Sequence, residues 1–305
     1  MRIFLTGATG FVGKTLLQRL LKEGHAVTAL LRRPDEGARL AQSLPLKGDF
    51  QYVAGDVVSG QGLEKGMESC HAVIHLVGII VEKGSNTFES VHHLGTRNVV
   101  EAAKKTGIKR FVQMSALGVR ADGVAEYQRS KWRGEEEVRH NGIPYCILRP
   151  SLIFGHGGFV DEMTGVMRQT PFFRPVPGDG LAKFRPISVD DVALCSTRAL
   201  TTESATGQTI DLGGSDELTL NQVLNEIAIA ADIRKPAVNI PMSLMKMGAR
   251  FAQLLPTPPV TVGQLRMLEE GSTCDIGPMK RIFNFTPEGF SGWGARTAQL
   301  SGRSL

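Results

Sequence analysis

The stretch MRIFLTGATGFVG, residues 1–13, decides the fold of this chain. An apolar run at residues 3–5 has the length of a buried strand, and from residue 11 to residue 21 apolar side chains recur at helical spacing. A second apolar run of strand length, residues 26–31, follows the helix. A strand, a glycine-spaced turn, a helix and another strand together predict a parallel βαβ unit.

The turn between the first strand and the helix is suited to the phosphates of a dinucleotide. Gly7 can turn without a Cβ, Gly10 lets the backbone approach a pyrophosphate, and Gly13 lets the helix pack close to its strand. Free N–H groups at the helix N-terminus attract phosphate. A tight turn with a purely structural role is the alternative. The cofactor contacts predicted here are Gly7, Thr9, Gly10, Phe11, Val12 and Gly13.

The end of the second strand indicates which dinucleotide binds. An NAD site has an acidic residue about twenty positions after the glycines, where it binds the ribose 2′-OH. Here the chain reads Leu31-Arg-Arg-Pro34, without a carboxylate. The guanidinium groups of Arg32 and Arg33 would instead bind a 2′-phosphate through forked, charge-assisted hydrogen bonds. The sequence therefore favours NADP(H) over NAD(H), although Asp35 and Glu36 could pair locally with the two arginines.

The composition of the 305 residues is that of an ordinary globular protein, with 42% hydrophobic and 21% charged residues. The formal net charge of +5 is spread along the chain, so no nucleic-acid partner is predicted. Four cysteines stand far apart without a CxxC pair, which is typical of reduced thiols, and no targeting leader is apparent. We therefore expect a cytoplasmic protein without a membrane span.

Strand and helix patterns alternate over the first 150 residues and predict a doubly wound, parallel α/β sheet of the Rossmann type. The predicted strands are residues 3–5, 26–31, 51–53, 72–76, 110–114 and 145–148. The predicted helices between them include residues 11–21, 36–43, 87–105 and 126–140. Further along, the sequence predicts an Asp-capped helix ending at residue 200, one more strand at 209–212, and a helix at 219–231.

Parallel strands have their carboxyl ends along one edge of the sheet, and open α/β folds bind ligands at that edge. Residues at or just after these ends are therefore predicted to reach the cofactor or the substrate. Asp56 could accept a hydrogen bond from the adenine amino group or, equally well, cap a helix. The residues at these strand ends are Gly7, Arg32, Asp56, Gly78, Ser115 and Pro150. Val57, Leu76 and Val77, which adjoin them, are also predicted cofactor contacts.

The composition changes after residue 150, where glycines and prolines mark a long irregular stretch. We expect a dinucleotide-binding domain over residues 1–150, to which residues 184–215 return. Residues 151–183 and 216–305 are expected to form a small C-terminal substrate or lid lobe.

Tyr127 and Lys131 lie four residues apart at the start of a predicted helix and so share one face. The lysine cation and a bound nicotinamide would lower the tyrosine pKa from its usual value near 10, which would allow acid–base chemistry. Lys131 could also hold the nicotinamide ribose, and Ser115 could orient a substrate carbonyl or hydroxyl. A half-buried tyrosine beside an exposed lysine is the structural alternative.

No metal site is predicted, because the histidines lack ligand spacing. His71 and His75 share a strand face without a third ligand, and His92 and His93 are adjacent. One of the adjacent pair is expected to face the ligand crevice.

A helix predicted around residues 243–255 has one apolar face and one basic face. We expect the apolar face to lie in the core of the small lobe, and docking to a membrane surface or to a partner protein is the alternative. The apolar residues are Leu244, Met247, Phe251 and Leu255, and the basic residues are Lys246 and Arg250.

Several motifs together indicate a family. They are Thr6-Gly-Ala-Thr-Gly-Phe-Val-Gly13, Gly55-Asp-Val57, His75-Leu-Val-Gly78, Gly95-Thr96, Ser115-Ala-Leu-Gly118, Tyr127-x-x-x-Lys131, Leu148-Arg-Pro-Ser151 and Pro186-x-x-Val-x-Asp-Val192. The chain resembles the extended and atypical short-chain dehydrogenases, often labelled NAD-dependent epimerase/dehydratase. Its Ser-Ala-Leu-Gly and Tyr-Gln-Arg-Ser-Lys segments and the proline-rich stretch 254–259 are similar to bacterial relatives of the 39 kDa NADH-ubiquinone oxidoreductase subunit.

The resemblance implies a Rossmann domain with a small C-terminal substrate lobe, in which Tyr127 and Lys131 are catalytic and Pro150-Ser151 contacts the nicotinamide end. It also implies a monomer, or a homodimer joined through four helices. Our leading hypothesis is an NADP(H)-dependent oxidoreductase or epimerase. Its small-molecule substrate would be a carbonyl or secondary alcohol, such as a quinone-related or isoprenoid-like compound. The rival is a non-catalytic nucleotide-binding subunit or assembly factor, docked to a respiratory or quinone-biosynthetic complex or peripherally at its membrane.

Overall fold

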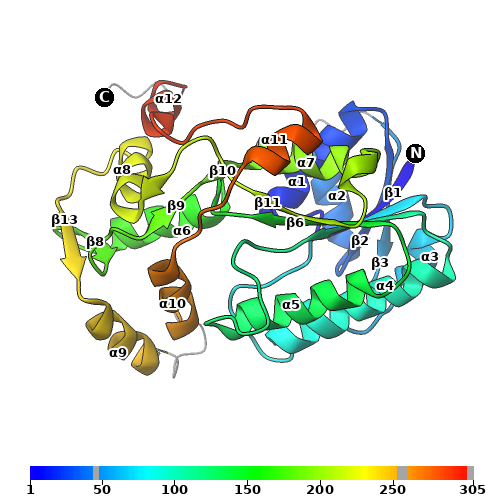
Figure 1. The fold of residues 1–305 in the computed structure, drawn as a ribbon, viewed down its shortest axis with the longest axis horizontal. Coiled ribbons are helices and arrows are strands. Elements are labelled where there is room, and N and C mark those ends of the chain that lie inside the picture. The colour runs from blue at the N-terminus through cyan, green and yellow to red at the C-terminus, as the bar shows by residue number, and fades with distance from the viewer. Residues whose placement is uncertain (44–47, 253–259, 301–305) are drawn as a thin grey trace. The chain divides into compact units, whose positions relative to one another are not determined.

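The computed structural model describes residues 1–43, 48–252 and 260–300 (Figure 1). The chain divides into two compact units, and the first consists of Met1–Arg149, Val189–Asp211 and Pro278–Asn284. The remaining described residues make up the second unit.

The first unit contains one large sheet and the helices that cover it. Its strands are β1 (Arg2–Thr6), β2 (Ala26–Leu31), β3 (Phe50–Ala54), β4 (Ala72–His75), β5 (Arg110–Met114), β6 (Tyr145–Pro150) and β11 (Gln208–Leu212). Its helices are α1 (Phe11–Lys22), α2 (Pro34–Ser43), α3 (Leu63–Met67), α4 (Gly95–Lys105), α5 (Glu126–Arg139), α7 (Val189–Arg198) and α11 (Gly277–Phe283), with a π-helix η1 (Glu89–Leu94) and a 3₁₀ turn η2 (Glu203–Ala205).

The seven strands lie in the order β11-β6-β5-β4-β1-β2-β3, so the predicted doubly wound α/β fold is confirmed. The pairings between β1, β2, β3, β4, β5 and β6 are all parallel. The additional strand predicted at residues 209–212 is β11, which adds to the sheet beside β6. The winding direction changes between β1 and β4, and a doubly wound sheet opens its ligand crevice at that point.

Helices pack on both faces of this sheet. Figure 1 shows α4 and α5 along one face, with α1 and α7 on the other. A buried apolar cluster joins the sheet to α3, α4 and α5 through residues that include Phe4, Val73, Val99 and Phe111. The strands read as continuous apolar runs because both faces of the sheet are covered.

Two predictions about helices need correction. The helix predicted at 87–105 starts at Glu89 and is a π-helix as far as Leu94, before α4 begins. Helix α7 begins at Val189 with Asp190 and Asp191 in its first turn, so neither aspartate is an N-cap residue.

The unit boundaries differ from the expected domains. The returning segment is Val189–Asp211 instead of residues 184–215, and α11 belongs to the first unit although residues 216–305 were all expected in the lobe. Met279 and Phe283 of α11 are buried, and Arg198 of α7 donates hydrogen bonds to the carbonyls of Phe283 and Asn284. One side chain, 85 residues earlier in the sequence, thus bonds to the C-terminal end of α11 and holds it in the first unit.

The second unit has its own apolar core. Its elements are β7 (Ile153–Phe154), α6 (Gly158–Gln169), β8 (Arg174–Pro177), β9 (Lys183–Phe184), β10 (Ile187–Ser188), β12 (Leu218–Thr219), α8 (Leu220–Ala230), β13 (Ala237–Ile240), α9 (Met242–Ala252), α10 (Val262–Glu270) and α12 (Trp293–Leu300). The strands form three two-stranded pairs. Phe154, Ile227, Phe290 and Trp293 lie in the core.

Candidate functional site

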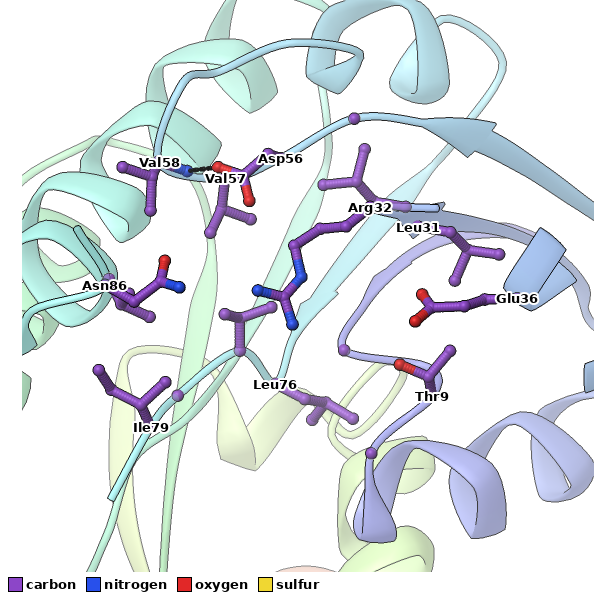
Figure 2. Close-up of a pocket in the computed structure, with 17 residues that line it drawn as sticks. Thr9, Leu31, Arg32, Glu36, Asp56, Val57, Val58, Leu76, Ile79 and Asn86 are labelled. Carbon is purple, nitrogen blue, oxygen red and sulfur yellow. Dashed lines mark hydrogen bonds between the residues drawn. The ribbon is translucent and has the colours of Figure 1, made fainter. Parts of the chain in front are cut away.

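A pocket of about 210 Å³ lies in the first unit at the point where the winding direction changes (Figure 2). The residues that line it come from the carboxyl ends of β1, β2, β3 and β4 and from the segments that follow them. Nine predicted cofactor residues are among them: Gly7, Thr9, Gly10, Arg32, Asp56, Val57, Leu76, Val77 and Gly78. The structure therefore brings together most of the residues that the strand-end argument selected.

The glycine turn at one end of the pocket has the geometry that a phosphate site needs. Gly7 has φ of +78°, and its carbonyl accepts the N–H of Gly10 at 3.0 Å. A Cβ on Gly13 would lie 2.0 Å from the Gly7 carbonyl oxygen, so only glycine allows α1 to pack this closely. No side chain caps the N-terminus of α1, whose first N–H groups have no partner within the helix. These residues fit a pyrophosphate.

The two predicted arginines occupy different places. Arg32 lines the pocket, and Figure 2 shows its guanidinium extending into it, with Glu36 and Thr9 on one side and Asn86 on the other. Arg32 makes no ion pair with any described residue. Arg33 is not among the lining residues, because its exposed guanidinium pairs with Glu36 at 2.5 Å. The local pairing considered from the sequence is thus present for Arg33 and absent for Arg32.

Asp56 lines the opposite wall and caps its own loop. One carboxylate oxygen accepts the N–H of Val58 at 2.7 Å and the N–H of Ser59 at 3.1 Å (Figure 2). The other carboxylate oxygen makes neither of these bonds and could accept an adenine amino group. The alternative role, a helix cap, is wrong, because Asp56 caps a loop and the N-cap of the next helix, α3, is Gly62.

Tyr127 and Lys131 lie one turn apart in α5, with the Lys131 ammonium 5.7 Å from the centre of the tyrosine ring. Lys131 is buried and donates a hydrogen bond to the Met114 carbonyl at 3.3 Å. A Cβ on Gly78 would lie 3.3 Å from the Lys131 ammonium, so Lys131 stands next to the pocket although it does not line it.

The protein's own residues do not lower the Tyr127 pKa, and the predicted lowering also involved a bound nicotinamide. Burial of the phenol raises its pKa to about 12, and the Tyr127 ring packs edge-on against Phe88 and His92. Burial likewise lowers the pKa of Lys131 to about 8, although nearby Glu135 opposes this effect. At neutral pH Tyr127 therefore holds its proton, and most Lys131 side chains are charged.

His92 links the pocket to the helix that carries Tyr127. The N–H of Ile79 donates to His92 Nε2 at 3.0 Å, so His92 Nδ1 carries the ring proton toward Ser130 Oγ, 2.9 Å away. Ser130 in turn donates to the Tyr127 carbonyl at 3.0 Å. Burial and the Lys131 charge lower the His92 pKa to about 2, so the ring stays neutral. His92 is thus the member of the histidine pair that faces the crevice.

The Ser115 hydroxyl makes its hydrogen bond to Glu135 instead of facing a substrate beside Tyr127. It donates to the buried carboxylate of Glu135 at 2.5 Å, and Glu135 also pairs with Arg139 and Arg149. Within the described part of the first unit, the Tyr127 hydroxyl makes no hydrogen bond. Among the described residues, the hydroxyl of Ser115 is thus bonded to Glu135 and not to Tyr127.

Other predicted site residues lie outside the pocket lining. Phe11, Val12 and Gly13 belong to the first turn of α1, beside the glycine turn. Pro150 and Ser151 belong to the second unit, where the Ser151 hydroxyl donates to the Ser272 carbonyl at 2.8 Å.

Sequence reasoning missed eight of the residues that line the pocket. Gly55 and Val58 adjoin the predicted Asp56 and Val57, and Ile79 adjoins Gly78. Including one more residue on each side of the predicted ones would have found all three. Glu36, Asn86 and Val91 carry no signal, because they reach the pocket from α2, a loop and η1. The eight residues are Leu30, Leu31, Glu36, Gly55, Val58, Ile79, Asn86 and Val91.

In residues 1–43, 48–252 and 260–300, no group of three or more histidine, cysteine, aspartate or glutamate side chains is arranged to hold a metal ion. Over the same ranges, no helix combines the length and the apolar character needed to span a bilayer.

Comparisons with known proteins agree with this site. A family model described as NAD(P)H-binding matches residues 7–203. Subunit 9 of the mitochondrial NADH dehydrogenase [ubiquinone] 1 alpha subcomplex from Arabidopsis thaliana is 31% identical over 223 residues, which is 71% of this chain and 54% of that protein. Ceramide reductase from Caulobacter vibrioides is 32% identical over 155 residues, which is 51% of this chain and 47% of that protein. The chain thus spans about half the length of these two relatives.

A solved structure, the UDP-glucose 4-epimerase of Thermotoga maritima, superposes with a TM-score of 0.74 over 99% of this chain and 100% of that chain. At 17% sequence identity this likeness shows the fold alone. The family match covers more than half of the chain and includes both the glycine turn and the Tyr127–Lys131 helix. This chain therefore belongs to the NAD(P)H-binding family of extended short-chain dehydrogenases, in which it resembles the 39 kDa subunit of NADH-ubiquinone oxidoreductase.

Proposed function

We propose that this protein is an NADPH-dependent reductase of a small carbonyl compound. The observation that carries the proposal is the position of Tyr127 and Lys131 on one face of α5, with the Lys131 ammonium beside Gly78 of the dinucleotide pocket. The pair is thus next to the strand end where a nicotinamide would lie. The ceramide reductase relative is named for a reduction.

Preference for NADPH rests on the charges around Arg32. A 2′-phosphate needs cations, and Arg32 extends into the pocket without an ion-pair partner among the described residues. Glu36 would repel a phosphate, but Arg33 neutralises its carboxylate through hydrogen bonds at 2.9 and 2.5 Å. Arg32 would therefore bind the phosphate directly. Arg33 would reduce the repulsion between Glu36 and the phosphate.

The chemistry of Tyr127 fits carbonyl reduction. Its phenol is protonated at neutral pH, so it can donate a proton to a substrate oxygen, and the same group would take the proton back in the reverse reaction. Lys131 would hold the nicotinamide ribose and stabilise the phenolate left after donation. Bound NADPH would supply the hydride to the carbonyl carbon and the oxygen would take the Tyr127 proton, so a ketone would become a secondary alcohol.

The proposal is tested by single-turnover oxidation of bound NADPH, followed at 340 nm, with an aliphatic ketone, an isoprenoid ketone and a quinone. Tyr127→Phe is expected to slow the reaction about 10²- to 10⁴-fold while leaving NADPH affinity unchanged. Tyr52→Phe on β3 serves as the matched control, because Tyr52 is exposed and lies outside the pocket lining. Oxidation at an equal rate in wild type and Tyr127→Phe would disprove the role of Tyr127.

A non-catalytic nucleotide-binding subunit is the second candidate, because Ser115 is bonded to Glu135 and the Tyr127 hydroxyl lacks a partner. A relative of this chain is itself named as a subunit of the NADH dehydrogenase. NADPH that binds tightly but is oxidised by none of the three carbonyl probes would favour this candidate, as would stable co-purification with a membrane complex.

A further inference from the structure

Helix α9 of the second unit has apolar side chains on two opposite faces. On the inner face Ala249 is buried, and α9 contacts α10. On the outer face Leu244, Met247 and Phe251 are 52%, 51% and 69% exposed. Spacings of three and four residues align these three side chains as one ridge, which we call the α9 ridge.

The exposed α9 ridge corrects the expectation that this face lies in the core of the small lobe. Leu255, the fourth residue expected on it, lies outside the described residues. Gly248, between Met247 and Ala249, has open space around its Cα, which agrees with an uncovered outer face. A helix that is apolar on both sides normally has a second apolar partner.

The charges around the α9 ridge identify that partner. Between Asp232 and Glu269 the sequence has five cations and no carboxylate: Arg234, Lys235, Lys246, Arg250 and Arg266. Three are engaged, since Lys246 pairs with Glu269, Arg234 pairs with Asp232, and Lys235 donates to three backbone carbonyls.

The other two cations, Arg250 and Arg266, make no ion pair with any described residue. Arg250 is on α9 itself, one residue before Phe251. Helix α9 therefore carries, beside its ridge, a cation that has no ion-pair partner among the described residues.

We propose that α9 binds the surface of an anionic phospholipid bilayer, with the α9 ridge at the boundary of headgroups and acyl chains and Arg250 at the lipid phosphates. Apolar side chains flanked by cations are the pattern of helices that lie in a membrane interface. A ridge of three side chains is far smaller than the roughly 800 Å² that each partner buries in a stable protein interface. The inference does not depend on the proposed reductase activity.

Flotation of the full-length protein with lipid vesicles tests the inference. Wild type is expected to float with phosphatidylcholine vesicles that contain phosphatidylglycerol, and to bind pure phosphatidylcholine or high-salt samples much more weakly. The triple variant Leu244→Ser/Met247→Ser/Phe251→Ser is expected to lose at least 10-fold in partition coefficient. Arg250→Ala should lose about fivefold on anionic vesicles alone.

The double variant Leu181→Ser/Val166→Ser is the matched control, because both side chains are exposed and apolar but belong to other segments of the second unit. It is expected to float like wild type. NADPH affinity of every variant reports whether the first unit is intact, and circular dichroism reports the overall fold.

Three results would overturn the inference. They are a wild type that stays in solution with anionic vesicles, a triple variant that still floats, and concentration-dependent dimerisation in sedimentation velocity that only the triple variant loses. The last result would mean that a second copy of this chain covers the α9 ridge.

Discussion

Arg32 and Arg33 are adjacent, yet their surroundings give them different roles. The side chain of Arg32 enters the pocket, while Arg33 pairs with Glu36 one helical turn further on. The sequence predicted that both arginines bind the phosphate, because both lie at the end of β2. The sequence does not show which way each side chain points. Only one of them is unpaired among the described residues.

Arg32→Ala is expected to weaken NADPH binding by about 10- to 100-fold, because charge-assisted hydrogen bonds contribute roughly 1.5–3 kcal/mol. NADH binding, which lacks the 2′-phosphate, should change much less. Isothermal titration with both coenzymes measures the difference. Arg39→Ala is the matched control, since Arg39 is on α2, pairs with Asp35 and does not line the pocket. Equal losses for NADPH and NADH would argue against a 2′-phosphate contact.

Lys131 couples the site to pH. Its pKa is about 8 in the folded protein and near 10.5 in the unfolded chain, so between these values the unfolded state binds more protons. The penalty of burying the charge is complete below pH 8 and absent above pH 10.5. The contribution of Lys131 to the free energy of unfolding therefore becomes more favourable as the pH rises from 8 to 10.5.

Lys131→Met should remove this change of the free energy of unfolding with pH, which is on the order of 3 kcal/mol between pH 8 and pH 10.5. Urea unfolding of wild type and variant at pH 7, 8, 9 and 10 gives the free-energy difference at each pH. The variant is expected to be the more stable protein at pH 7, with its advantage shrinking as pH rises. A difference that stays constant with pH would contradict the assigned shift.

At the scale of elements, the turn from β1 to α1 depends on Gly13. Its missing Cβ lets the helix backbone pass close to the Gly7 carbonyl. Gly13→Ala is expected to displace the N-terminus of α1, to destabilise the first unit by several kcal/mol and to abolish NADPH binding. Thermal unfolding and coenzyme titration test this.

Gly165→Ala in α6 is the control for Gly13→Ala, because nothing lies within 4 Å of the added Cβ. Alanine is the better helix former there, so a gain of about 0.5–1 kcal/mol is expected. A Gly13→Ala protein that binds NADPH normally would show that the close packing is dispensable.

The π-helix η1 was the element that the sequence predicted least well. A periodic apolar pattern predicts a helix but not its type. The π-helical turns of η1 accompany contacts with residues outside the helix. His92 of η1 accepts a hydrogen bond from Ile79 and bonds to Ser130 of α5. Such turns often occur at functional sites.

His92→Phe keeps a ring at this position but leaves the Ile79 N–H and the Ser130 hydroxyl without that partner. The Ser130 hydroxyl is buried, and a buried group left unpaired costs about 1–3 kcal/mol, so we expect a clear loss in the free energy of unfolding. Amide hydrogen exchange at Ile79 should accelerate as well. His140→Ala is the control, because the His140 side chain is 75% exposed. Unchanged exchange at Ile79 would contradict the link.

At the scale of the whole molecule, the chain enters the first unit three times. The last passage is α11, whose Phe283 is 1% exposed, while Phe290, seven residues later, is equally buried in the second unit. Neighbouring residues in the sequence thus stabilise different cores.

Phe283→Ala should cost about 3–5 kcal/mol and accelerate hydrogen exchange in α7 and β11. Phe290→Ala should cost a similar amount but accelerate exchange in α8 and β7 of the second unit. Hydrogen exchange read by mass spectrometry separates the two patterns. If both variants accelerate exchange in the same elements, the division at residue 285 is wrong.

The sequence by itself determined the order of strands and helices, the glycine turn and the strand ends that line the dinucleotide pocket. These features depend on local backbone conformation and on apolar periodicity, which a linear pattern records. Only the tertiary structure decided that Arg33 pairs with Glu36, that Ser115 bonds to Glu135, that burial raises the Tyr127 pKa, and that the α9 ridge is exposed. Each of these depends on groups that the fold brings near one another or leaves uncovered, and burial and hydrogen bonding in three dimensions have no counterpart in sequence spacing.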